Sequence, residues 1–308
     1  MDSVLHYADE HVFDALYAKL IPTSMAANAT SEFAINWTRD NVLRQSLSIF
    51  IMVTLGGWFF YLAMASFSYY FVFDHETMDH PKFLKNQVRL EIECAVSAIP
   101  GFSLLTVPWF VGEVNGHSML YDGVPQDLKG WLYLVASVPT FLFFTDFGIY
   151  WAHRWLHHPL LYKRLHKPHH KWIVPSPFAS HAFHPVDGYM QSVPYHLYAY
   201  LVPMHKWLYV FMFVFVNFWT VMIHDGNFIS HSHIINTTAH HAVHHLYFNY
   251  NYGQYFTLWD RLGNSHRQPT DEQYDANLRN DQKVMAKQAR DAELIEAQDE
   301  LKAKKKAQ

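Results

Sequence analysis

Three histidine-rich motifs, each beside a long apolar segment, constrain this chain more than any other feature of its sequence. Seventeen of the 23 histidines lie between His153 and His245, and most of them fall in three short boxes. The boxes span residues 153–158, 166–170 and 240–245. Neutral imidazole is the commonest protein ligand for a transition metal, and three such boxes supply donors for two ions. The sequence therefore predicts a two-metal site at a membrane surface.

Four apolar regions are candidates for crossing a bilayer, which takes about 20 helical residues. The second region is the weakest candidate because Pro100 and Pro108 interrupt it. The fourth is too long for one span and joins histidine motifs at both ends, so we expect a re-entrant pair or two short helices. The regions are 45–73, 94–111, 130–150 and 193–223. The predicted fold is an all-α integral membrane protein with about four transmembrane helical hairpin elements and a cytosolic, histidine-rich, di-metal helical cap.

Charged residues beside the apolar regions predict the orientation. Lys82, Lys85 and Arg89 follow the first region, five basic residues follow the third, and residues 113–126 contain neither lysine nor arginine. The positive-inside rule then places the histidine boxes and the C-terminus in the cytosol.

Two further features agree with this orientation. Asn28 and Asn36 begin Asn-x-Thr sequons on the predicted lumenal side. The terminal Lys305-Lys306-Ala307-Gln308 resembles the dilysine retrieval sequence of endoplasmic reticulum membrane proteins. We therefore expect a multi-pass protein of the endoplasmic reticulum membrane.

The first box continues directly from the third apolar region. Asp146, Tyr150, His153 and His157 are spaced by four, three and four residues, which places them on one face of a helix. Asp146 is then either an outer-shell acceptor or a substrate-side polar group, the alternative being a polar residue packed inside the bundle.

The other two boxes also fit short helices. Pro168 suits the first turn of a helix that carries His169 and His170, with His166 just before it. Thr237 or Thr238 is a plausible N-cap for the helix of the third box. There the candidate ligands, at helical spacing, are His241, His244 and His245.

Some histidines outside these positions remain candidates. His184 and His224 follow or precede apolar helices close to the boxes, so each is a predicted ligand or outer-shell residue. The sequence does not decide whether His181 and His240 support the metal ligands or have a structural role.

The number of histidines also bears on the chemistry. A zinc hydrolase typically uses three protein ligands, whereas at least eight histidines qualify here and no His-Glu-x-x-His motif occurs. This excess of imidazole in a membrane setting favours two non-haem iron ions that activate O2. No glycine-rich dinucleotide fingerprint is present, so electrons must come from a separate carrier.

The series His-x3-His, His-x2-His-His and His-x2-His-His resembles that of the fatty acid hydroxylase superfamily of membrane di-iron oxidases. Within it, three stretches resemble the sterol C-5 desaturases, also called lathosterol oxidases: residues 73–87, 180–189 and 240–260. The resemblance covers roughly residues 41–265. By this resemblance the box ligands correspond to His153, His157, His166, His169, His170, His241, His244 and His245, and His184 and His224 match further positions of the pattern.

The resemblance implies an enzyme that removes hydrogens from C-5 and C-6 of a Δ7-sterol to give a 5,7-diene, in sterol biosynthesis. It also implies O2 as co-substrate, with electrons from NAD(P)H through cytochrome b5 and its reductase. Two alternatives stay open: a sterol methyl oxidase or lipid hydroxylase of the same superfamily, and a histidine-rich metal transporter. The transporter is disfavoured because the boxes lie at the ends of the apolar regions rather than within them.

The chain is expected to divide into three parts. Residues 1–44 form a lumenal segment, residues 45–270 the membrane-embedded di-iron oxidase domain with its cytosolic cap, and residues 271–308 a charged cytosolic tail. The tail lacks a large apolar stripe, so we expect a solvated helix there. Partners are the sterol, the electron carriers and the bilayer; the formal net charge of −4 gives no surface for nucleic acid. The single cysteine, Cys94, excludes an intramolecular disulfide.

Overall fold

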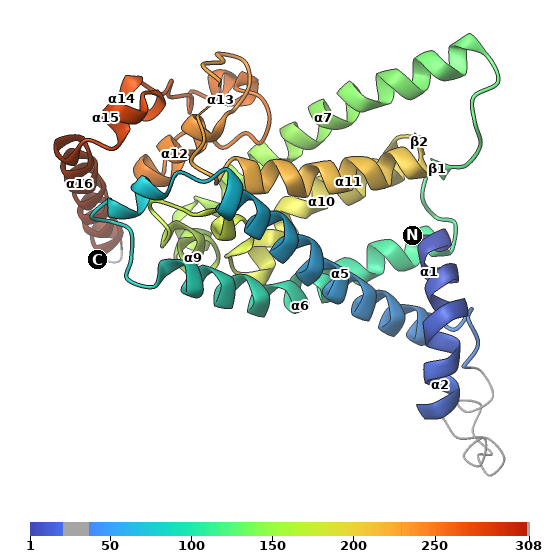
Figure 1. Cartoon of the computed structure of the whole chain (residues 1–308). Helices are drawn as coiled ribbons and strands as arrows, with labels where there is room; N and C mark the ends of the chain where they lie inside the picture. The colour runs from blue at the N-terminus through green and yellow to red at the C-terminus, as the bar shows by residue number, and fades with distance from the viewer. Residues whose placement is uncertain (21–36, 229, 307–308) are drawn as a thin grey trace.

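The structure, a computed structural model, describes residues 1–20, 37–228 and 230–306 (Figure 1). The predicted sequons at Asn28 and Asn36, and the last two residues of the dilysine sequence, lie outside the described residues. Long helices run side by side through the middle of the molecule. The N-terminal helices lie at one end of them and a cap of short helices and loops at the other (Figure 1).

Three helices are long and apolar enough to cross a membrane: α5 (Val42–Phe71), α6 (Gln87–Val114) and α7 (Leu128–Leu156). Only 22% to 39% of their apolar windows is buried within the protein, so most of these side chains need lipid around them. Phe59 and Phe67 on α5, for example, are 68% and 59% exposed. The chain is therefore a multi-pass membrane protein. Pro100 and Pro108 lie inside α6 without ending it.

The fourth apolar region forms two helices of 17 residues, α10 (Pro185–Leu201) and α11 (Lys206–Met222). This confirms the interpretation of two short helices. The turn between them contains β2 (Met204–His205), which pairs in parallel with β1 (Leu120–Tyr121). Both helices end or begin at the histidine-rich cap, as the sequence predicts.

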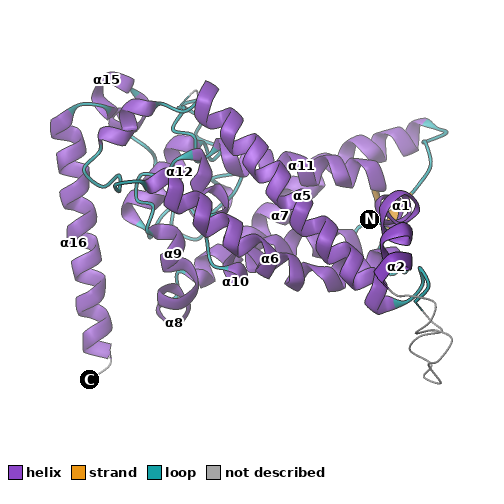
Figure 2. Cartoon of the chain, turned by 60° about the horizontal axis from the view of Figure 1, so that its bottom comes forward, coloured by secondary structure: helices purple, strands orange, loops and turns teal. Residues whose placement is uncertain are grey.

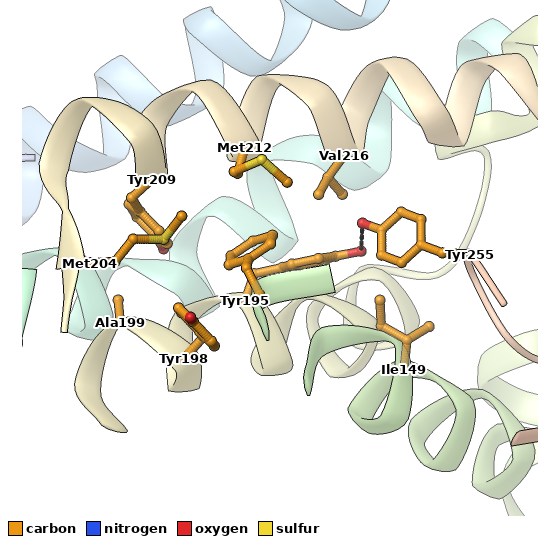
Figure 3. Close-up of a cluster of buried hydrophobic side chains, with 10 residues drawn as sticks. Ile149, Tyr195, Tyr198, Ala199, Met204, Tyr209, Met212, Val216 and Tyr255 are labelled. Carbon is orange, nitrogen blue, oxygen red and sulfur yellow. Dashed lines mark hydrogen bonds between the residues drawn. The ribbon is translucent and has the colours of Figure 1, made fainter. Parts of the chain in front are cut away.

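An aromatic core joins α10 and α11 to α7. Ile149, Tyr195 and Val216 are buried there, and Figure 3 shows Tyr195 pointing toward Tyr255. The two phenolic oxygens are 3.3 Å apart. Tyr255 belongs to the loop that follows the third histidine box, so this contact ties the cap to the membrane helices. Gly148 permits the close crossing of α7 and α10, because a Cβ there would lie 2.7 Å from Pro194.

The cap consists of short elements. Thr237 is the N-cap of the third-box helix, with a reciprocal capping box to His240. Pro168 lies in the first turn of the second-box helix. Both features are as predicted. The elements of the cap are α8 (Pro159–Leu161), η3 (Tyr162–His166), α9 (Lys167–His170), η4 (Pro177–His181), α12 (Thr238–Tyr247) and α13 (Leu258–Leu262).

The remaining elements include the helix of the tail, α16. This helix forms as predicted, but it is not exposed to solvent on all sides. Met285, Ala289 and Ala292 are buried, and Ile295 packs against a buried cluster of α12 that contains Val243, Leu246 and Tyr247. The sequence analysis missed this contact because two of the buried residues are alanines, which make a narrow stripe. These elements are α1 (Asp2–Ala8), η1 (Asp9–Phe13), α2 (Asp14–Leu20), η2 (His75–Asp79), α14 (Asp271–Tyr274), α15 (Ala276–Arg279) and α16 (Gln282–Lys306).

Candidate metal centre

The three histidine boxes and His224 converge into two groups of imidazoles. In each group, one ligand atom from every member lies within 4.8 Å of the others. The groups adjoin, since the rings of His170 and His245 are 5.2 Å apart between centroids. The first group is His153, His157, His166, His170 and His244, and the second is His169, His224, His241 and His245.

A different helix positions each box at the centre. His153 lies in the last turn of α7 and His157 is its C-cap, so the first box projects from the end of a membrane helix. α9 turns the second box so that His169 and His170 enter different groups. The third box divides in the same way, with His244 in the first group. Two adjacent histidines in one helix thus serve both halves of the centre.

Hydrogen bonds to oxygen define the protonation of two rings in the first group. His153 Nδ1 lies 3.0 Å from the carbonyl oxygen of Tyr252, and His166 Nδ1 lies 2.7 Å from a carboxylate oxygen of Asp187. Since these oxygens accept, both Nδ1 atoms carry protons, which leaves Nε2 as the ligand atom of each ring. The two Nε2 atoms lie 3.0 Å apart. One metal ion could therefore take both as ligands.

The second group has the same arrangement. His224 Nδ1 donates to the carbonyl oxygen of Thr220 at 2.7 Å, which leaves a lone pair on its Nε2. That Nε2 lies 2.9 Å from Nε2 of His241, which in turn lies 3.1 Å from Nε2 of His245. Each group therefore brings its ligand nitrogens close to one point.

Burial favours the neutral form, which a metal requires, at seven of these imidazoles. It lowers the pKa of His169 and of His224 to about 3 each. Burial first, and then the neighbouring imidazoles, lower the pKa of the other ligands outside the membrane helix well below the ordinary value: His157, His170, His241, His244 and His245.

A buried nitrogen without a partner gives a further test of whether a metal fits. Among the described residues, Nε2 of His244 has no hydrogen-bond partner. A buried polar atom without a partner costs about 1–3 kcal/mol. This nitrogen belongs to the first group, so coordination to a metal ion would satisfy it. The donor set fits two transition-metal ions of the kind that imidazole binds.

Oxygen acceptors behind the rings hold the ligands in place. Asp187 is fully buried, binds His166 and accepts from Gln191 Nε2 at 2.8 Å. The carbonyl oxygen of Tyr250 lies 2.7 Å from Nδ1 of His244. Such acceptors set the tautomer and orientation of metal-binding histidines. Sequence reasoning did not assign Asp187, although a carboxylate three residues after His184 was a usable indication.

Asp146 contacts the loop after the third box instead of a histidine. Its Oδ1 accepts from the backbone amides of Gln254 and Tyr255 at 2.8 and 2.6 Å. The same loop supplies the Tyr252 carbonyl that holds His153. Asp146 therefore acts on the centre through the loop.

Three other candidate histidines lie outside both groups. His184 is the N-cap of α10, where its Nδ1 accepts from the Val186 amide at 3.2 Å, so the structure does not bring it to the centre. His240 forms the capping box of α12 with Thr237. His181 lies beside the centre, with Nε2 3.2 Å from Asn217 Oδ1.

A cavity of about 360 Å³ opens onto the histidine groups. His153, His169, His224 and His241 line one end of it, and Glu113 is among the residues at the other. Between them the walls come mainly from α5, α6, α10 and α11, and they are largely apolar. A long apolar ligand in this cavity would have one part beside the imidazoles.

The fold and site define a multi-pass membrane protein with two adjoining histidine clusters that could hold metal ions. A family profile described as "Fatty acid hydroxylase" matches residues 138–265, which contain all three boxes. No solved structure matches the chain.

Relatives match over nearly the whole length. The Delta(7)-sterol 5(6)-desaturase of Saccharomyces cerevisiae is 47% identical over 98% of this chain and 94% of its own. That of Schizosaccharomyces pombe is 50% identical over 96% and 93%. That of Candida albicans is 52% identical over 97% and 77%. The chain belongs to the Delta(7)-sterol 5(6)-desaturases of the fatty acid hydroxylase family.

Replacing His224 tests the division of the ligands into two groups. We expect His224→Ala to lower the metal content of purified, iron-loaded protein from two ions per chain toward one, because only the second group loses a donor. His184→Asn keeps a capping side chain at the start of α10 and should retain both ions. Iron and protein are quantified in the same samples. Equal metal loss in the two variants would contradict the assignment.

Asp187→Asn tests the support behind His166. An amide is a weaker acceptor than a carboxylate, so we expect metal affinity to fall about 10- to 100-fold while the fold is retained. The measurement is competition with a chelator of known affinity. Asp127→Asn, which preserves an N-cap at the distant start of α7, is the matched control. Unchanged affinity in Asp187→Asn would show that this carboxylate does not support the centre.

Proposed function

We propose that this chain introduces the C5–C6 double bond into a Δ7-sterol, with O2 as oxidant and two iron ions at the histidine centre. The observation that carries the proposal is a long apolar cavity that ends on two adjoining groups of neutral imidazoles. The full-length similarity to proteins named for this reaction supports the same substrate class.

Nine histidines would hold the two ions. One ion would lie in the group of five and the other in the group of four. When bound, reduced iron supplies the activation of O2 needed to remove hydrogen from an unactivated carbon. His184 is not included, because the geometry gives it a capping role.

The overall reaction requires electrons from outside the chain. Reduction of O2 to two water molecules takes four electrons and four protons. The sterol supplies two of each when C-5 and C-6 each lose a hydrogen, so two electrons and two protons must come from elsewhere. We propose NAD(P)H as their source, through cytochrome b5 and its reductase.

The chain's own contribution is to position the sterol and exclude water. The lining residues Ile99, Phe102, Thr106, Phe110 and Glu113 follow one face of α6 at helical spacing. They extend over about 21 Å at a rise of 1.5 Å per residue, which suits an elongated, rigid lipid. Position also determines the product, since small shifts of the reacting carbon separate desaturation from hydroxylation.

The same proposal includes location and topology. Basic residues next to α6 and after α7 support a cytosolic histidine cap, with the N-terminal helices on the lumenal side. The endoplasmic reticulum is the proposed membrane because the resemblance to the sterol C-5 desaturases implies it.

The reaction is tested on membranes that contain this protein, its electron carriers, NADH and a Δ7-sterol. We expect an O2-dependent product with the ultraviolet absorbance of a conjugated 5,7-diene and a mass two hydrogens below that of the substrate. A hydroxylated sterol in its place would move the chain to a hydroxylase activity and contradict the proposal.

Filling the cavity tests its role in substrate binding. A Cβ at Gly56 of α5 would meet nothing within 4 Å, and Gly56 lines the cavity, so Gly56→Phe can occupy the space without a backbone clash. We expect kcat/KM for the sterol to fall roughly 10-fold or more, with metal content unchanged. Gly56→Ala adds little volume and is the control. Full activity in Gly56→Phe would place the sterol elsewhere.

A further inference from the structure

Positive charge is concentrated around the second histidine box. Residues 147–186 contain no aspartate or glutamate, yet they contain five basic residues. This is a local property, because the whole chain carries a formal net charge of −4. The five basic residues are Arg154, Lys163, Arg164, Lys167 and Lys171.

One short helical segment separates these charges from the metal centre. On its inner side His166, His169 and His170 are buried within the two imidazole groups. On its outer side four basic residues are exposed, and three of them are spaced by four residues. We call this outer side the basic stripe; it consists of Lys163, Arg164, Lys167 and Lys171.

The wall between the basic stripe and the centre is therefore a single helix. An α-helix with its side chains is about 10–12 Å across, and the histidines occupy its inner half. The covalent path is also short, since Arg164 and Lys167 flank the ligand His166 within two residues. Figure 2 shows α8, which leads into this segment, projecting from the cap. A protein bound here would approach the ions more closely than one bound on the tail helix.

We propose that the basic stripe is the docking surface for an acidic one-electron carrier protein. This inference rests on the proposed function, in which two electrons per turnover must come from outside the chain. The carrier would deliver them in two successive encounters, each transferring one electron to the centre. Opposite charge would speed these encounters, and such steering by several charges raises association rates by 10- to 1000-fold at low salt.

The experiment reverses two charges that lie on the outer side only. Lys163→Glu with Arg164→Glu is compared with Lys129→Glu with Lys283→Glu, which changes net charge by the same amount at exposed positions elsewhere. The full-length, iron-loaded proteins are placed in uncharged lipid nanodiscs. The probe is the soluble haem domain of cytochrome b5, held reduced at varied concentration and ionic strength.

We expect KM for the carrier to rise about 10-fold or more in the stripe variant at low salt, with a weaker dependence on salt than in the wild type. The control variant should keep the wild-type KM and salt dependence. Unchanged KM and salt dependence in the stripe variant would overturn the proposal.

A single-turnover measurement separates electron delivery from chemistry. Each protein is reduced chemically, freed of reductant and mixed with O2 and a Δ7-sterol, so that no carrier is needed. Equal diene per centre in the wild type and the stripe variant supports docking as the affected step. A matching loss of diene in the stripe variant would overturn it, and would indicate that these residues serve the fold or bind lipid headgroups. No diene from the wild type would instead be a failure of the proposed function.

Discussion

The structure depends on bringing nine imidazoles together in two adjoining groups. In the first group, His153 and His166 each donate a proton from Nδ1 to an oxygen behind the ring, and their Nε2 atoms lie 3.0 Å apart. In the second group, the Nε2 atoms of His224 and His241 lie 2.9 Å apart. Imidazoles gathered this closely fit coordination to transition-metal ions. The cap and the ends of the membrane helices hold them in this arrangement.

Direct contacts join the membrane helices to the cap around this centre. α7 ends in the first box, and His224 follows the end of α11, so two ligands are attached to helices within the bilayer. Asp146 holds the loop after the third box, and Tyr255 of that loop contacts Tyr195 of α10. The cavity lies between the same helices. A lipid in this cavity would therefore lie beside the imidazole groups.

Much of this arrangement could be predicted from the sequence because it depends on local patterns. The histidine spacing, the N-cap Thr237 and Pro168 are properties of a few neighbouring residues. The division of the fourth apolar region into two helices followed from its length and from the boxes at its two ends. Asp187 was missed because its partner His166 is 21 residues away in the sequence. The buried side of α16 depends on tertiary packing, which spacing alone does not reveal.

The most direct test of the account is X-ray absorption at the iron edge of the purified, iron-loaded, full-length protein. The account predicts two irons per chain whose nearest neighbours are mainly imidazole nitrogens, with five histidines available to one ion and four to the other. A nearest shell dominated by carboxylate oxygens, or a single iron in a fully active protein, would contradict it.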